Sequence, residues 1–294
     1  MGALTISSLA ESLGAEVAGV DLSSPLSAQD RHVLEEVWRT RLVLVFRDQV
    51  IDDAAQIRFS RSFGDLEIYP LGDNRSSGHP EIFRVSNCDE QGELLPADDP
   101  DSLWNNLTEY WHTDSSYRRG PAAGAVLNGI EVPGQGGDTS FVNLKAAYEA
   151  LPSHRKSELD GMVAVHDWTH GYNYAADLMK SMKPEEVEAV PPVRHRLIRV
   201  DPKTGERSLF ISPGYVAAID GMSDDNARGL IEELTEWAIQ PRFVYKHRWQ
   251  RRDVLMWNNP PTMHARDAFD YASQKRIMHR TTIVGDARAS GELV

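Results

Sequence analysis

The chain has 294 residues, and its 44 acidic side chains against 31 basic ones give a formal net charge of −13. This acidic balance argues against nonspecific nucleic-acid binding, which needs basic patches. The single cysteine, Cys88, excludes an intramolecular disulfide. The sequence shows neither a secretory leader nor an apolar run near the roughly 20 residues needed to cross a bilayer. We therefore expect a soluble, cytoplasmic protein with no nucleic-acid or membrane partner.

In the first half of the chain, capping residues followed by apolar residues at helical spacing predict helices, and short β-branched runs predict strands. In chain order these are a helix capped by Ser27, a strand over residues 42–46, a helix over 53–63, a strand near 81–85, strands over 122–130 and 139–142, and a helix over 144–151. Residues 72–108 are otherwise polar and rich in turn-forming residues, which predicts long loops.

The second half shows the same mixture of many short strands and few helices. In chain order we predict a hairpin with strands 192–200 and 208–212 around a turn at 201–205, an amphipathic helix over 225–239, and strands over 242–249, 254–257 and 276–284. Neither an internal repeat nor a linker divides the chain, so residues 1–294 are predicted to form one domain. The pattern indicates a β-rich α+β fold with a jelly-roll core and flanking helices.

A possible metal site begins at His112-Thr-Asp114. In an extended segment, residues two apart point to the same face, so one imidazole and one carboxylate can reach a common cation. His264, after the strand over 254–257 and a turn over 258–261, is the candidate third ligand. Two histidines and one carboxylate on one face of an octahedron leave three positions open, as in non-haem Fe(II) oxygenases. A His-X-Asp sequence by itself is usually structural. Here the apolar strand and the GGDT segment (residues 136–139) that follow it, together with His264 and the arginines downstream, favour a metal site.

Two other classes of protein also fit two histidines and a carboxylate. A zinc hydrolase uses such a ligand set, but the chain lacks an evident general base in a motif such as His-Glu-X-X-His. A cupin-like metal-binding module without catalysis would explain the strands and the ligands. It would give no reason for the downstream arginines.

The remaining histidines carry weaker signals. His166 and His170 have the spacing of a metal pair on a helix, but no carboxylate accompanies them. His247 and Trp249 alternate along a predicted strand and are interpreted as packing or surface residues. His279 lies between two arginines and should face the opposite side of its strand. Residues 134–137 (GQGG) are interpreted as a turn and not as a nucleotide-binding loop.

Several segments together resemble the taurine/2,4-dichlorophenoxyacetate (TauD/TfdA) dioxygenase family. They occur in the family's order and span nearly the whole chain: residues 42–47 (LVLVFR), 59–64 (FSRSFG), 111–116 (WHTDSS), 136–139 (GGDT), 146–151 (AAYEAL), 257–264 (WNNPPTMH) and 276–280 (RIMHR). The interval of 27 residues from position 112 to position 139 also matches the family pattern. The resemblance implies a double-stranded β-helix, which is a form of jelly roll.

The resemblance also implies a role for individual residues. His112, Asp114 and His264 would be the catalytic iron ligands, and Thr139 and Arg276 would bind the distal carboxylate of 2-oxoglutarate. A guanidinium and a hydroxyl suit that carboxylate chemically. Arg280, on the same strand face as Arg276, would bind the anionic group of the primary substrate. The interval from position 264 to 276 is one residue longer than the family pattern, which predicts an insertion within residues 266–274.

The reaction implied by the resemblance is hydroxylation of a substrate C–H bond by O2, with oxidative decarboxylation of 2-oxoglutarate and with ascorbate as a possible support. A homo-oligomer is also implied. Tyr69 stands where taurine-specific members have histidine, so an aryloxyacetate-type carboxylate is favoured as the small anionic substrate. Tyr69, Tyr110 and Tyr117 are candidates to line its pocket, and residues 72–108 are the candidate lid. Taurine or other sulfonates, alkyl sulfates and N-acyl amino acids are the alternatives.

Overall fold

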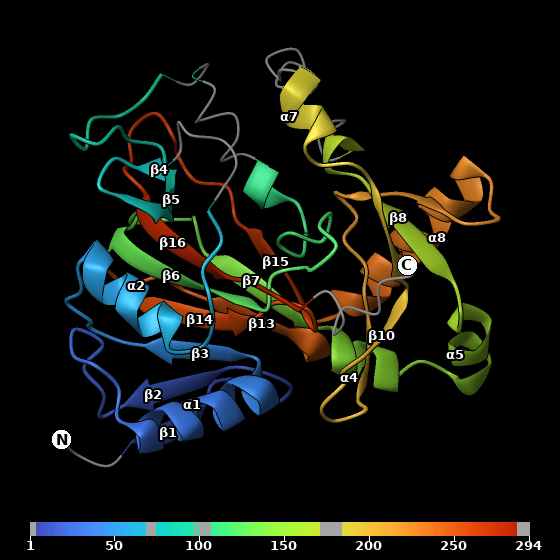
Figure 1. Cartoon of the computed structure of the whole chain (residues 1–294), viewed down its shortest axis with the longest axis horizontal. Coiled ribbons are helices and arrows are strands. Elements are labelled where there is room, and N and C mark those ends of the chain that lie inside the picture. The colour runs from blue at the N-terminus through green and yellow to red at the C-terminus, as the bar shows by residue number, and fades with distance from the viewer. Residues whose placement is uncertain (1–3, 69–74, 97–98, 100–106, 171–183, 287–294) are drawn as a thin grey trace.

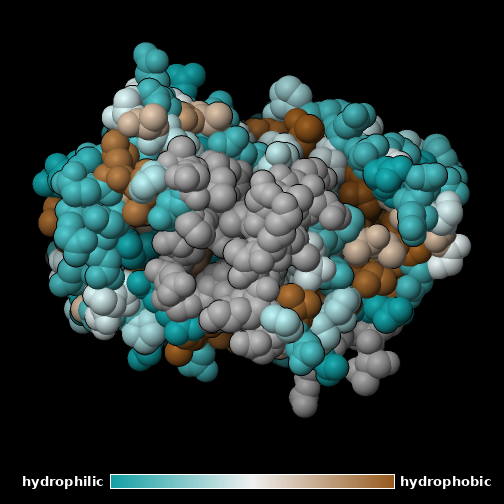
Figure 2. All heavy atoms as spheres, turned by 90° about the horizontal axis from the view of Figure 1, so that it is seen from above, coloured by the Kyte–Doolittle hydropathy of each residue, from teal (hydrophilic) through white to brown (hydrophobic). Residues whose placement is uncertain are grey.

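The computed structural model describes residues 4–68, 75–96, 99, 107–170 and 184–286. Figure 1 shows a large sheet with α1 and α2 beside it, and a second group of elements around β8 and α8. Mostly hydrophilic side chains cover the described part of the face seen in Figure 2. None of the described helices is both long and apolar enough to span a bilayer.

The large sheet has eight strands in the order β1-β2-β3-β14-β6-β16-β5-β4. All neighbours are antiparallel except β2 and β3, which are parallel. The strands are β1 (Thr5–Ser8), β2 (Ala15–Ala18), β3 (Val43–Phe46), β4 (Arg75–Ser76), β5 (His79–Ser86), β6 (Gly124–Glu131), β14 (Val254–Asn258) and β16 (Ile277–Ile283).

A three-stranded antiparallel sheet, β13-β7-β15, faces the large sheet and completes the jelly roll. Its strands are β13 (Val244–His247), β7 (Thr139–Asn143) and β15 (Thr262–Arg266). Phe141 of β7 and Trp257 of β14 meet across the interior with ring centroids 5.7 Å apart. Both belong to an apolar cluster that also holds Leu127 and Met278. The expected jelly-roll core is therefore confirmed.

Two helices cover the outer face of the large sheet. Helix α1 (Ala28–Arg41) begins at Ser27, whose side chain accepts a hydrogen bond from Asp30 N, as the sequence predicts. Helix α2 (Asp53–Arg61) is capped in the same way by Asp52. The fully buried amide of Gln56 donates to the backbone carbonyls of Val126 and His279, which fastens α2 to β6 and β16.

The remaining elements form a second apolar core beside the jelly roll. A three-stranded sheet has the order β12-β8-β9, and β10 pairs with β11 across the predicted turn at residues 201–205. The strand expected over residues 192–200 is divided at Leu197, and its first part, β9, pairs with β8 instead of β11. The elements are the 3-10 helix η1 (Leu107–Glu109), α4 (Leu144–Glu149), α5 (Ser153–Leu159), β8 (Val163–His166), α7 (Pro184–Glu188), β9 (Val193–Arg196), β10 (Ile198–Val200), β11 (Arg207–Leu209), β12 (Val216–Ile219), α8 (Asp224–Ala238) and the 3-10 helix η3 (Pro241–Phe243).

Some elements differ from the sequence prediction. Strands β1, β2, β8, β12 and β15 and helix α5 were not predicted, and the helix expected over residues 53–63 ends at Arg61. The strand expected over residues 242–249 begins only at Val244, because residues 241–243 form a 3-10 turn with proline at its start. The unpredicted strands are short, and several are stabilised by pairing with partners distant in sequence.

His166 and His170 do not form a helical metal pair, in agreement with the weakness of the sequence signal for one. His166 lies at the end of strand β8, so the spacing of four residues has no helical meaning there. Its ring is fully buried, stacks on Phe210 and meets the edge of the ring of His195. Neither of its ring nitrogens has a hydrogen-bond partner. Burial holds the pKa of His166 well below its ordinary value and lowers the pKa of His195 to about 4.

We expect this buried pair to make the folded state less stable in acid. Both rings are neutral in the folded protein, whereas an unfolded histidine titrates near 6.5, so the unfolded state binds more protons below that pH. Their contribution to the free energy of unfolding is complete above pH 6.5. It falls on acidification by roughly 1.4 kcal/mol per pH unit for each histidine. When urea unfolding is measured between pH 7.5 and 5, the free energy of unfolding should fall less steeply for His166→Leu than for the wild type. The exposed His32 gives the control His32→Gln. If the free energy of unfolding had the same slope against pH in all three proteins, the buried histidines would not be the cause of the acid sensitivity.

Candidate metal centre and co-substrate pocket

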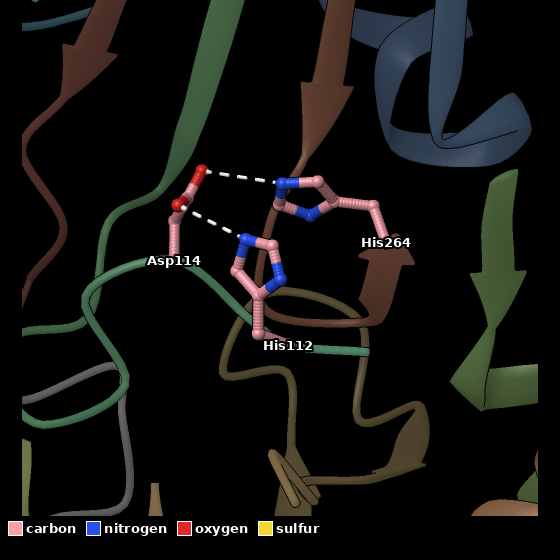
Figure 3. Close-up of side chains that lie close together, drawn as sticks. All are labelled: His112, Asp114 and His264. Atoms are coloured by element: carbon pink, nitrogen blue, oxygen red, sulfur yellow. Dashed lines mark ion pairs between the residues drawn. The ribbon is translucent and has the colours of Figure 1, made fainter. Parts of the chain in front are cut away.

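Three potential ligands converge between the two sheets of the jelly roll (Figure 3). His264 lies on β15, and His112 pairs with it through a single antiparallel bridge. The backbone N–H of each histidine donates to the carbonyl of the other, at 3.0 and 2.8 Å. The chain turns directly after this bridge and reaches a positive φ of 53° at Ser115, so the extended strand expected around His112 is limited to one pair. Asp114 nevertheless points toward both rings.

The geometry suits a metal ion. The ligand atoms all lie within 4.8 Å of one another, and the three side chains are buried. Asp114 Oδ1 lies 3.8 Å from His112 Nε2, and Asp114 Oδ2 lies 3.8 Å from His264 Nε2. These separations are too long for hydrogen bonds, but they are less than twice a typical metal–ligand distance of about 2.1 Å. Asp114 Oδ2 is buried and has no hydrogen-bond partner among the described residues, so it is available to a cation.

Backbone and amide contacts hold these ligands in place. The Tyr110 carbonyl lies 2.7 Å from His112 Nδ1, so that nitrogen carries the proton and Nε2 keeps its lone pair for a metal. Asn259 accepts a hydrogen bond from Asp114 N at 3.0 Å and donates to the Asp114 carbonyl at 2.8 Å. Asn259 is fully buried. The turn between β14 and β15 therefore fixes the metal-binding loop.

Electrostatics keep the three groups in the forms that bind a metal. Burial lowers the pKa of His112 and lowers the pKa of His264 to about 3, so both imidazoles are neutral. Burial opposes ionisation of Asp114. Arg280 and the two imidazoles outweigh it and hold the pKa of Asp114 below its ordinary value. The Arg280 guanidinium donates to Asp114 Oδ1 at 2.8 Å.

A pocket opens beside the two histidines, between the facing sheets. Its apolar wall includes Val85, Leu127 and Trp257. Its polar residues come from both sheets and from the segment before the metal loop: Thr108, His112, Thr139, His264, Arg266, Arg276 and Arg280. The predicted residues Thr139, Arg276 and Arg280 are thus brought together with the histidines, and His279 is not. The ring of His279 faces α2 and bonds to Asp53, as its position on the strand predicts.

Arg276 is the most unusual group in this pocket. It is only 4% exposed, and within the part of the chain that the structure describes its Nε has no hydrogen-bond partner. Among the described residues no carboxylate forms an ion pair with it, and burial together with neighbouring Arg266 lowers its pKa to about 9. A buried charge of this kind is costly unless it is paired. The pocket therefore favours an anionic ligand.

Arg266 is a pocket residue that the sequence analysis missed. Its guanidinium is held by Thr108, Glu109, Tyr271 and the Asp267 carbonyl, at 2.7 to 3.0 Å. Glu109 belongs to η1 and Tyr271 follows β15, so Arg266 joins η1 to the segment between β15 and β16. The available signal was its position two residues after His264, since residues two apart on a strand share a face.

The glycines of the GGDT segment have a steric function. Gly136 and Gly137 both have positive φ, at 74° and 68°. A Cβ on Gly137 would lie 2.7 Å from Pro133 Cγ and 3.4 Å from the Cδ and Nε of Arg276. The turn expected at residues 134–137 is therefore confirmed, and its tightness lets the backbone pack against the Arg276 side chain.

The candidate substrate residues are less completely described. Arg280 lies over the Phe83 ring, 4.9 Å from its centroid, and contacts Asp114 on the metal side. Tyr117 is 5% exposed and packs against the rings of Tyr215 and Trp168. Tyr110 is 45% exposed. Tyr69 lies outside the described residues, as do residues 72–74, 97–98 and 100–106 of the proposed lid.

Comparisons with known proteins agree with this geometry. Residues 5–282 match the family described as taurine catabolism dioxygenase TauD, TfdA family. The chain is 33% identical to an alpha-ketoglutarate-dependent 2,4-dichlorophenoxyacetate dioxygenase of Burkholderia sp. strain RASC, over 94% of this chain and 93% of that protein. It is 31% identical to an (S)-phenoxypropionate/alpha-ketoglutarate-dioxygenase of Sphingobium herbicidovorans, covering 97% and 96%.

A solved structure is also similar. The crystal structure of AAD-2 in complex with Mn(II) and N-oxalylglycine has a TM-score of 0.87 and 33% sequence identity, covering 97% of this chain and 98% of that one. The chain therefore belongs to the TauD/TfdA family of non-haem iron, 2-oxoglutarate-dependent dioxygenases.

The contact between Gly137 and Arg276 can be tested by substitution. Gly137→Ala should lower both the melting temperature and the affinity for 2-oxoglutarate, because the added methyl group strains the turn and displaces the Arg276 side chain. Gly205 is a matched control, since its φ is 74° and a Cβ there would meet no atom within 4 Å. Gly205→Ala should show only the backbone strain of about 1–2 kcal/mol. Equal affinity for 2-oxoglutarate in the two variants would refute the steric assignment.

Proposed function

We propose that this chain hydroxylates a small anionic organic substrate, of the aryloxyalkanoate carboxylate class, at an iron held by His112, Asp114 and His264. We propose further that Arg276 and Thr139 bind the distal carboxylate of 2-oxoglutarate. The observation that carries the second part is the buried, unpaired guanidinium of Arg276 in the pocket beside the histidines. N-oxalylglycine, bound in AAD-2, carries the same two terminal carboxylates as 2-oxoglutarate.

The protein's own part is to bind, orient and exclude water. An iron ion held by His112, Asp114 and His264 would, with 2-oxoglutarate and O2, supply the oxidising chemistry of hydroxylation, and 2-oxoglutarate would be converted to succinate and CO2. Arg276 would provide a positive charge in the pocket, and Thr139 would provide a hydroxyl. Asn259 and the Tyr110 carbonyl keep the ligand atoms aimed at one point. Neither a zinc hydrolase nor a non-catalytic module would need this second, cationic pocket.

The substrate class follows from Arg280 and from the named relatives. Arg280 touches Asp114, so an anion bound to Arg280 would lie beside the metal site. A planar guanidinium with five N–H donors pairs well with a planar carboxylate. Two relatives above 30% identity are named for aryloxyalkanoate substrates. Hydroxylation next to the ether oxygen of such a substrate would release a phenol and, from an aryloxyacetate, glyoxylate.

The family resemblance supports four further proposals. Residues 1–294 form one domain, because the ligands and the co-substrate residues come from both sheets of the jelly roll. The chain acts in the cytoplasm, and it assembles as a homo-oligomer. Residues 72–108 close over bound substrate, and Tyr69, Tyr110 and Tyr117 line the side of the site that receives it.

The two arginines should separate kinetically. Arg276→Gln should raise the apparent KM for 2-oxoglutarate roughly 10-fold to 150-fold, which corresponds to the loss of a charge-assisted contact of about 1.5–3 kcal/mol. Arg280→Gln should mainly raise KM for the primary substrate. Removing the unpaired charge should also leave ligand-free Arg276→Met at least as stable as the wild type. The exposed Arg194 gives the control Arg194→Gln. Identical effects of Arg276→Gln and Arg280→Gln on both ligands would contradict the proposal that the two arginines bind different ligands.

The substrate class is tested by a panel measured at saturating 2-oxoglutarate. The panel should contain aryloxyacetates, aryloxypropionates, alkyl sulfates, N-acyl amino acids and taurine, with succinate and hydroxylated product both quantified so that uncoupled turnover is excluded. We expect the highest kcat/KM for an aryloxyalkanoate. A higher value for taurine or an alkyl sulfate would overturn the substrate class and leave the iron chemistry intact.

A further inference from the structure

A half-buried indole lies behind the co-substrate pocket. Trp249 follows the end of β13, and its Nε1 donates a hydrogen bond to Thr139 Oγ1 at 2.9 Å. Thr139 is 4% exposed and lines the pocket. The sequence suggested only a packing or surface role for Trp249, but this contact links it to a residue proposed to bind 2-oxoglutarate.

The direction of this hydrogen bond has a chemical consequence. A threonine hydroxyl has one proton and can accept at its lone pairs, whereas an indole nitrogen can only donate. Trp249 therefore fixes Thr139 Oγ1 as the acceptor on one side, and the hydroxyl proton must point elsewhere. No hydrogen-bond acceptor for that proton occurs among the described residues. A carboxylate can only accept, so the hydroxyl is oriented for the kind of ligand that Arg276 also requires.

The indole itself is held from several sides. It packs on the backbone of β6, because a Cβ on Gly129 would lie 3.1 Å from Trp249 Cε3. On another side the ring of Trp249 meets the ring of His247 at 4.7 Å in an edge-to-face contact. The backbone of Gly129 in turn exchanges hydrogen bonds with Asp253 and Arg252 at 2.8 and 2.7 Å. The position of Nε1 is thus set by the rigid sheet.

A polar network fixes His247 beneath the indole. His247 is fully buried, with Nε2 3.0 Å from Asp253 Oδ2 and Nδ1 3.0 Å from the Tyr245 hydroxyl. Because a carboxylate only accepts, Nε2 carries the proton and Nδ1 accepts from Tyr245. Asp253 is also paired with Arg47 at 2.5 Å. Charge and hydrogen bonding therefore extend from Arg47 to the ring that supports Trp249.

We infer that Trp249 is a positioning residue for 2-oxoglutarate, which orients the Thr139 hydroxyl as a donor to the distal carboxylate. This inference rests on the proposed role of Thr139 and adds the residue through which that role is achieved. Trp249 is not among the residues that line the pocket, so its effect on the ligand would pass through the Thr139 hydroxyl. The two residues must therefore be coupled energetically in ligand binding.

A double-mutant cycle measures this coupling. The Kd for 2-oxoglutarate is determined by anaerobic titration of the Fe(II)-loaded enzyme, followed by the visible charge-transfer band of the keto-acid chelate. Trp249→Phe should weaken binding about threefold to tenfold, which is the fold-change expected for one neutral hydrogen bond. In the Thr139→Val background the same change should alter Kd less than twofold. Binding of the primary substrate should not change.

Matched variants separate orientation from packing. Trp237 is also a half-buried tryptophan whose Nε1 donates a 2.9 Å hydrogen bond, to the Ala147 carbonyl, in the second core. Trp237→Phe should lower stability without altering the Kd for 2-oxoglutarate. If Trp249→Phe does not fold, benzothienylalanine at position 249 keeps the ring shape and removes only the N–H, and it should reproduce the weaker binding.

The outcomes distinguish a failure of the inference about Trp249 from a failure of the proposed role of Thr139. Equal losses from Trp249→Phe in the wild-type and Thr139→Val backgrounds would overturn the inference, as would unchanged binding in the benzothienylalanine variant. If Thr139→Val alone left Kd unchanged, the proposed role of Thr139 would itself be wrong. A loss that appears only when Thr139 is present establishes Trp249 as the positioning residue.

Discussion

The buried positive charge of Arg276 is the constraint around which the pocket is arranged. Its guanidinium is enclosed between two sheets, and among the described residues no carboxylate pairs with it. Such a charge costs several kcal/mol in a protein interior unless a ligand or partner compensates it. The backbone at Gly137 packs closely against the Arg276 side chain. A second guanidinium, that of Arg266, lies beside it and is hydrogen-bonded at each of its nitrogens. If Arg276 binds the distal carboxylate of 2-oxoglutarate as proposed, binding of that ligand is linked to the stability of the fold.

The jelly roll supplies the geometry that this chemistry needs. Thr139, His264 and Arg266 come from the small sheet, and Arg276 and Arg280 come from the strand β16 side of the large one. Cross-strand pairing places Thr139 opposite both His247 and Arg266. The rings of Phe141, Trp257 and His264 then fill the space between the sheets. The metal ligands are consequently part of a packed core, with little freedom to move apart.

Asp114 connects the two halves of the site. One of its oxygens contacts Arg280, and the other is buried without a partner and faces His264. The buried carboxylate of Glu67 lies nearby, accepts from Ser115 at 3.1 Å, and has a pKa raised by burial. Sequence reasoning did not identify Glu67. Its position next to the metal loop results from the pairing of Leu66 with Ile283, which brings the end of the α2 segment beside β16.

The sequence by itself determined the ligand types, their order and the fold class. His112-Thr-Asp114, the GGDT turn, His264 and the two arginines are local patterns, and their expected roles come from the family that these patterns together resemble. Helices α1, α2 and α8 were predictable because capping residues and apolar spacing are also local. The hairpin β10–β11 was predictable from its turn.

Only the tertiary structure decided which residues support those patterns. Strand β15 is five residues long and is fixed by pairing with β7, more than a hundred residues earlier, so no local signal specified it. The same is true of Arg266 and Trp249, whose places beside the pocket result from contacts between segments distant in sequence. His166 shows the converse, since a spacing typical of a helical metal pair falls on a strand and is buried against Phe210. Local propensity fixes short-range structure, whereas hydrogen-bond partners across a sheet are chosen by the packing of the whole chain.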